Sequence, residues 1–179
     1  ALPIWSPTKK EEIIQIEKIQ RLATDWIIKN PHRTQPGYKD YKQRLITCNI
    51  MPLTYRREIT DIIFLCKTLN NTSGVKFDQK LKLPDRNVGA RTGIQTNQNL
   101  ITLPKTNRRN AFEYYPSRVA RIWNTLPEDL RNILKTTDDP LLIKQNIIPL
   151  YKYELEHHFK PDDTCTWIHF CTCTKCKYA

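Results

Sequence analysis

The residues whose types and spacing are best suited to chemistry are four cysteines near the end of the chain: Cys165, Cys171, Cys173 and Cys176. Four thiolates can close a tetrahedral zinc site, and the last pair has the two-residue spacer of a zinc knuckle, whereas the middle pair does not. We therefore expect one structural zinc ion in a Cys-rich tail over residues 161–179. A reduced, metal-free tail is the first alternative. Disulfides are the second, disfavoured because no secretion signal is visible.

Positive charge is the next feature, and it is unevenly distributed. The net charge is +11, and residues 31–110 carry fifteen Lys and Arg against five Asp and Glu, which leaves the rest of the chain nearly balanced. Such a concentration is expected on a surface that faces a polyanion, although a solvated basic face without a partner would look the same. The candidates for phosphate contact are Lys39, Lys42, Arg44, Arg56, Arg57, Arg108, Arg109, Arg118 and Arg121.

Four aromatic residues lie close to the end of this basic region. Tyr114 and Tyr115 are candidates for stacking on unpaired bases. Phe112 and Trp123 have apolar neighbours at helical spacing, which favours a place in the core for both.

No complete enzyme active site is visible in the sequence. Four glycines spread over 179 residues cannot form a phosphate loop, and no Gly-x-Ser-x-Gly or His-Glu-x-x-His motif occurs. Asp138 and Asp139 resemble the paired carboxylates that bind two metal ions, but Pro140 follows them, so we interpret them as a helix cap. His157 and His158 are interpreted as part of a solvated helix face.

The elements that must position these residues are predicted to be helices. The apolar periodicity indicates an all-α fold, an irregular bundle of about five to six helices with a long basic loop and the Cys-rich tail. The predicted helices cover residues 7–30, 38–48, 53–69 and 115–124, a short stretch after Pro127, and a last stretch from Asp138 with a break or kink at Pro149 and a continuation over 151–159. Residues 75–107 are predicted to be loop, with a short strand over 100–103.

Two packing arrangements follow from this pattern. In the first helix Ile13, Ile16, Gln20, Ala23 and Ile27 form one stripe, and other apolar residues widen it, so we expect this helix to be covered on more than one side. Phe112, Val119, Ile122, Trp123 and Leu126 are expected to form the face against which the first and third helices pack. We predict one helical domain over residues 1–160, followed by the tail.

Four blocks of sequence, in this order, resemble a known family. They are Ile4-Trp5-Ser6-Pro7, the run Ile16 to Thr24, Leu53-Thr54-Tyr55-Arg56-Arg57, and Phe112 to Pro127 with its Val119-x-x-Ile122-Trp123-Asn124-Thr125-Leu126-Pro127 core. Together they are similar to the C-terminal region of the reverse transcriptases of non-LTR retrotransposons of the jockey and chicken-repeat type. The Cys-Thr-Trp and Cys-x-Cys-x-x-Cys ending resembles the tails of some such elements.

The resemblance implies a thumb and post-thumb region that grips template RNA and primer. It also implies that the catalytic aspartates lie upstream, in a Tyr-Ala-Asp-Asp box that this sequence lacks. The chain would then be a fragment of an RNA-directed DNA polymerase, inactive alone. Mg²⁺ would enter only through the absent palm, and the partners would be RNA, RNA–DNA hybrid and that palm.

The remaining expectations concern location and a rival function. No apolar run approaches the ~20 residues of a membrane helix, and no secretory signal is visible, so we expect an intracellular protein, nuclear or cytoplasmic. The rival is a zinc-stabilised protein-interaction module, or an inactive relic of a retroelement. Replacing Arg108 and Arg109 by Glu separates them, because only a nucleic-acid-binding protein would lose affinity for nucleic acid.

Overall fold

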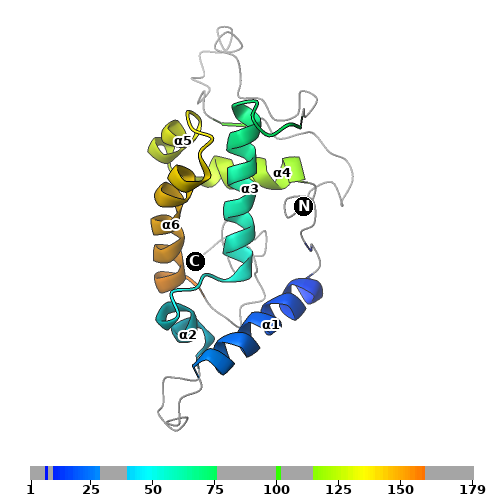
Figure 1. Cartoon of the computed structure of the whole chain (residues 1–179), viewed down its shortest axis with the longest axis vertical. Helices are drawn as coiled ribbons and strands as arrows, with labels where there is room; N and C mark the ends of the chain where they lie inside the picture. The colour runs from blue at the N-terminus through cyan, green and yellow to red at the C-terminus, as the bar shows by residue number, and fades with distance from the viewer. Residues whose placement is uncertain (1–6, 8–9, 29–39, 76–99, 102–114, 160–179) are drawn as a thin grey trace, which may run out of the picture. The chain divides into compact units, whose positions relative to one another are not determined.

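The computed structural model describes Pro7 and residues 10–28, 40–75, 100–101 and 115–159, and these residues contain six α-helices and no strand. The helices are α1 Lys10–Ile27, α2 Tyr41–Thr47, α3 Leu53–Leu69, α4 Tyr115–Thr125, α5 Glu128–Leu134 and α6 Pro140–His157 (Figure 1). The predicted all-α class is therefore confirmed. Nearly all of the predicted basic loop and the whole Cys-rich tail lie outside the described residues.

The described residues belong to two compact units. Those between Glu58 and Asn146 form one unit, and those up to Arg57 together with those from Ile147 onward form the other. Helices α3 and α6 each contribute to both units. The predicted boundary at residue 160 falls where the described residues end, so the proposed division into domain and tail stays a prediction.

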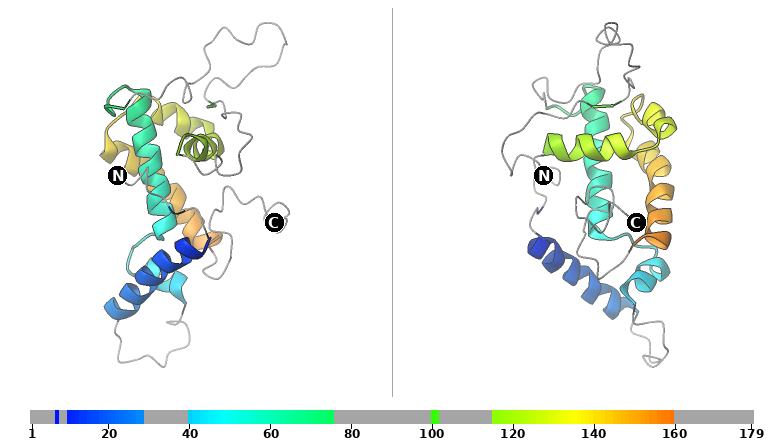
Figure 2. Two further views of the ribbon diagram at one scale, coloured as in Figure 1. Left: turned by 90° about the vertical axis from the view of Figure 1, so that its right-hand side faces the viewer. Right: turned by 180° about the vertical axis from the view of Figure 1, so that it is seen from behind.

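The unit from Glu58 to Asn146 has an apolar core. Helix α4 runs across α3, as Figures 1 and 2 both show, and the ring of its first residue, Tyr115, meets the Phe64 ring edge-on at 5.4 Å. Val119, Ile122 and Trp123 of α4 are completely buried. The prediction that this segment packs inside against the third helix is confirmed for its described residues. Phe112 lies outside them, and packing against α1, which lies in the other unit, stays a prediction.

A short segment, Leu100 and Ile101, packs against the end of α4 in the same unit. The side chain of Asn124 accepts a hydrogen bond from the backbone N–H of Ile101 at 2.8 Å and donates one to its carbonyl at 2.9 Å. The amide of Asn124 thus satisfies both backbone hydrogen-bonding groups of Ile101, as a neighbouring strand would. The Ile101 side chain is itself buried. Leu100 and Ile101 are not in a strand, and the other two residues of the predicted strand lie outside the described part.

The helices end where local chemistry provides caps. Asn49 after α2 and Asn71 after α3 take left-handed conformations, with φ of 52° and 58°. The next residue after each, Ile50 and Thr72, donates its backbone N–H to the carbonyl of Leu45 and of Lys67, respectively. This is the Schellman arrangement.

The beginning of α6 confirms one sequence interpretation and corrects another. Asp139 accepts a hydrogen bond from the backbone N–H of Leu141 at 3.0 Å, so the acidic pair does contain a helix cap. Of the predicted break or kink at Pro149, the break is wrong, because α6 continues to His157, and the kink stays a prediction. Pro149 and Gln145 are both exposed, so water can solvate the Gln145 carbonyl that loses its intrahelical donor.

The second unit is centred on aromatic rings. The Tyr55 ring meets the rings of Tyr151 and Phe159 edge-on at 5.2 and 5.9 Å, and Phe159 also lies 6.3 Å from Tyr41. Such tilted contacts are the favoured geometry for aromatic pairs. They join α2 and the first turn of α3 to the second half of α6 and to Phe159, which follows it, within this unit.

Helix α1 departs from its sequence pattern in two ways. It begins at Lys10 rather than at Pro7. Its buried residues are Ile13, Gln20 and Thr24, whereas Ala23 and Ile27 of the predicted inner stripe are exposed. The expected cover on a second side is also absent among the described residues, where Ile19 and Leu22 lie open to solvent.

Candidate nucleic-acid interface

The corner between α1 and α2 brings together several of the predicted basic residues that lie within the described part of the chain. The two helices contact each other within one unit. Helix α2 begins at a defined place because Asp40, in an extended conformation, accepts a hydrogen bond from the backbone N–H of Lys42 at 3.1 Å. This cap fixes where α2, the helix that carries Lys42 and Arg44, begins.

Glu17 of α1 holds the corner together through both of its carboxylate oxygens. One oxygen accepts a hydrogen bond from the Tyr41 hydroxyl at 2.5 Å, and the other accepts from the backbone N–H of Leu53 at 3.2 Å. Leu53 is the first residue of α3, where a helix leaves its backbone donors unsatisfied. A single acid therefore caps one helix from another and anchors the ring of a third, and hydrogen bonds to charged groups are the stronger kind.

Tyr41 is buried, and two guanidinium groups lie over its ring. Arg21 Cζ lies 4.9 Å from the centroid of its ring and Arg44 Cζ lies 5.7 Å from it, both within cation–π range. Burial, followed by the hydrogen bond to Glu17, raises the pKa of the Tyr41 hydroxyl well above its usual value, so it remains a donor at neutral pH. The ring orders two cations without adding negative charge of its own.

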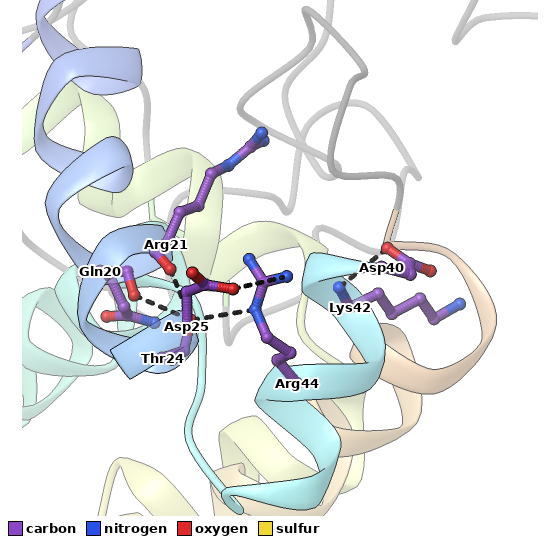
Figure 3. A network of polar contacts seen from close by, with 7 residues as sticks. All are labelled: Gln20, Arg21, Thr24, Asp25, Asp40, Lys42 and Arg44. Carbon is purple, nitrogen blue, oxygen red and sulfur yellow. Dashed lines mark hydrogen bonds and ion pairs between the residues drawn. The ribbon is translucent and has the colours of Figure 1, made fainter. Parts of the chain in front are cut away.

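A polar network ties Arg44 to α1, as Figure 3 shows. Arg44 Nε donates to Thr24 Oγ1 at 3.5 Å, and Arg44 Nη1 lies 4.0 Å from Asp25 Oδ1. The Thr24 hydroxyl in turn donates to the Gln20 carbonyl at 2.9 Å, and Gln20 Nε2 donates to the Met51 carbonyl at 2.9 Å. The inner face of α1 is therefore built from directed polar contacts.

The candidate residues at this corner differ in their access to solvent. The Arg44 side chain is only 12% exposed, so this residue mainly joins α1 to α2. Lys42 is half-buried and its side chain points away from α1 in Figure 3, while Arg56 in the first turn of α3 is exposed. Arg57 is half-buried, and its Nε donates to the Leu53 carbonyl of its own helix at 3.2 Å.

In the other unit two predicted site residues turn out to be interior ones. Arg118 donates to both carboxylate oxygens of Asp61, at 2.7 and 3.2 Å, with 5% and 3% of the two side chains exposed. Its assignment as a phosphate contact was wrong, because its charge is neutralised inside the fold. Tyr115 is buried as well, and its hydroxyl donates to the Asp61 carbonyl at 3.1 Å, so it cannot stack on a base.

The remaining predicted site residues fall into two groups. Arg121 is half-buried on α4. The others lie outside the described residues, and their roles stay predictions: Lys39, Arg108, Arg109 and Tyr114 for nucleic acid, and Cys165, Cys171, Cys173 and Cys176 for zinc. Within the part of the chain that the structure describes, no group of three or more His, Cys, Asp and Glu side chains could hold a metal ion.

Sequence reasoning missed Arg21 and Glu17, the two α1 residues that complete the corner. Both lie outside the basic region 31–110, and their partners Tyr41 and Leu53 are 20 to 36 residues away in the chain. The available signal was their four-residue spacing, which puts an acid and a base on one side of the helix. That spacing alone looks like an ordinary surface pair.

Comparison with known proteins adds no relative: no family model, no curated protein and no solved structure matches the chain. None of the helices described is long and apolar enough to cross a lipid bilayer.

Proposed function

We propose that this chain is the C-terminal, nucleic-acid-gripping part of a non-LTR retrotransposon reverse transcriptase. In this role the chain binds template RNA and primer, and it does not contain the catalytic palm. The observation that carries the proposal is the charge excess of ten within residues 31–110, in a chain whose other residues nearly balance. The order of the four sequence blocks that resemble this family supports it. A catalytic role for the chain alone is not part of the proposal.

The α1–α2 corner offers a suitable surface for a phosphate backbone. Lys42 and Arg56 have exposed or partly exposed side chains in one unit, and Arg21 is partly exposed beside the Tyr41 ring. Backbone phosphates carry no sequence information, so cations on rigid helices suffice to hold a duplex in position. Arg44 and Glu17 would act as positioning residues, because their contacts fix the helices that carry those cations.

The experiment measures binding of an RNA–DNA hybrid by fluorescence anisotropy at a series of salt concentrations. The affinity should fall steeply with salt, because each phosphate contact releases counterions. Replacing Lys42 and Arg56 by Gln should weaken binding to every sequence tested. The fall of log affinity with log salt should also become shallower, its slope decreasing in magnitude by about 2, roughly one for each lost phosphate contact.

The matched control replaces Lys144 and Lys152 by Gln. Both are exposed on α6, and this pair of changes lowers the net charge by two, from +11 to +9, as the test pair does. A local interface predicts nearly unchanged binding for the control. Absence of binding at low salt, binding indifferent to salt, or equal losses in the two variants would each refute the proposal.

A further inference from the structure

The outward side of α1 carries a stripe of large apolar side chains. Ile19, Leu22 and Trp26 are 67%, 59% and 71% exposed, and their spacings of three and four residues place them along one side of the helix. The opposite side, with Gln20 and Thr24, is the one that packs inward. We define Ile19, Leu22 and Trp26 as the outer stripe.

We propose that the outer stripe pairs with the same stripe of a second copy of this chain, with the two α1 helices antiparallel. In this register Ile19 of each copy packs on Leu22 of the other, and Trp26 packs over Gln15. The stripe thus has the seam spacing of a short coiled coil, in which positions three and four residues apart meet the facing helix. The pairing forms a closed, two-fold dimer.

The charges beside the stripe select the second copy and the antiparallel direction. Lys18 and Asp25, both exposed, lie seven residues apart along the same flank of the stripe. An antiparallel pair places Lys18 of each copy opposite Asp25 of the other, which gives two identical ion pairs. A parallel pair would place Lys18 opposite Ala23, with no opposite charge to meet. On the other flank Ile16 faces Ala23, an apolar contact.

Asp25 can take part without giving up its contact within the chain. Its carboxylate lies 4.0 Å from Arg44, and 48% of its side chain remains exposed. A carboxylate accepts several hydrogen bonds, so a second cation can approach from the open side. Two other occupants fit less well. A phosphate backbone offers no apolar surface to cover the outer stripe, and helices that lie on membranes carry Lys and Arg on their polar side, whereas α1 carries Glu11, Glu12 and Asp25.

The first test is the mass of the full chain in solution, without nucleic acid, measured by sedimentation over a range of concentrations. The wild type should approach twice the monomer mass as its concentration rises. Replacing Ile19 and Leu22 by Glu should leave the monomer mass at every concentration, with unchanged helical circular dichroism. The matched control replaces Leu141 and Leu142, also exposed, by Glu and should dimerise like the wild type.

The second test determines the direction of pairing. A zero-length carbodiimide cross-link should join Lys18 to Asp25, because the antiparallel dimer brings them together. Within one helix their seven-residue separation spans about 10.5 Å along the axis, which is too far for such a link. A mixture of ¹⁴N and ¹⁵N protein should therefore give mixed-mass cross-linked peptides. A monomer at all concentrations, a dimer that survives the Ile19 and Leu22 changes, or an absent Lys18–Asp25 link would overturn the proposal.

Discussion

Helices α1 and α4 carry similar proportions of apolar residues, but they use them in opposite ways. In α4 the large apolar side chains face inward, and Val119, Ile122 and Trp123 are completely buried. In α1 the polar Gln20 and Thr24 face inward, whereas Leu22 and its apolar neighbours on the outer stripe face solvent. The number of apolar residues in a helix therefore does not determine which side of it is buried. That side is determined by the partners that the fold places against the helix.

The arginines of the two regions differ in the same way. Arg118 of α4 is neutralised by Asp61 inside one unit, where both side chains are almost fully buried. Arg21 of α1 lies over the Tyr41 ring at the edge of the other unit and is only partly buried. A buried ion pair neutralises both charges inside the fold, whereas a cation that lies over an aromatic ring keeps its positive charge in a partly exposed position. Under the proposed function, only a cation of the second kind would contact a phosphate.

The largest expected contrast is between the two tryptophans. Trp123→Ala in α4 should lower the free energy of unfolding by about 3–5 kcal/mol, because it opens a cavity in a packed core. Measured at concentrations where the chain is monomeric, Trp26→Ala in α1 should change it by no more than about 0.5 kcal/mol, since the side chain is largely exposed in the single chain. Urea unfolding followed by circular dichroism measures both. Similar losses for the two variants would show that the two helices do not differ in the way described.

The buried ion pair of α4 gives a second strong effect. Asp61→Ala should cost about 3–5 kcal/mol, because it leaves the Arg118 guanidinium charged and buried without its carboxylate. Replacing both residues, with Asp61→Leu and Arg118→Met, should restore most of the loss, since no uncompensated charge remains. The same unfolding measurement compares them. A double variant no more stable than Asp61→Ala would argue against the ion pair as the cause.

A smaller effect distinguishes the buried tyrosines of the two regions. Tyr41→Phe removes a hydrogen bond to the Glu17 carboxylate and should cost about 1.5–3 kcal/mol. Tyr115→Phe removes one to a backbone carbonyl and should cost about 0.5–1.5 kcal/mol. Unfolding at neutral pH should therefore rank Tyr41→Phe below Tyr115→Phe in stability. The reverse order would contradict the anchoring role of Glu17.

The same two tyrosines predict how stability responds to alkaline pH. Burial is the main cause that raises the pKa of each hydroxyl above the usual value near 10. Above that pH the unfolded chain loses these protons while the folded chain keeps them, so stability falls as pH rises. Each Tyr→Phe variant should show a weaker decline between pH 10 and 11 than the wild type. An unchanged decline in both variants would exclude these groups as its source.

Much of the local structure could be predicted from the sequence. The extent of α4 was predicted nearly as observed. The stop of α3 at Asn70 and Asn71 and the cap of α6 at Asp139 follow from short-range chemistry, in which a residue acts on backbone within a few positions. The burial of Trp123 followed from its apolar neighbours in α4. Periodicity failed for α1, because its apolar residues are spread around the helix and define no single inner face.

The candidate site was predictable only in part. Lys42 and Arg56 were correctly placed on helices, but the sequence did not separate them from Arg118, which has the same charge and a similar setting. The difference is the Asp61 carboxylate, 57 residues earlier in the chain, which takes Arg118 inside. Arg21 and Glu17 were missed for the same reason, since their partners on α2 and at the start of α3 are distant in sequence.

By itself, the sequence determined the all-α class, most helix ends and the confinement of the charge excess to residues 31–110, because propensity, capping and composition depend on near neighbours or on none. Only the tertiary structure decided which side of α1 faces inward and which arginines remain accessible. Those outcomes depend on contacts across 20 to 57 residues, such as Tyr41 with Glu17 and Asp61 with Arg118. Folding brings these partners together, and no local sequence pattern predicts which residues will pair.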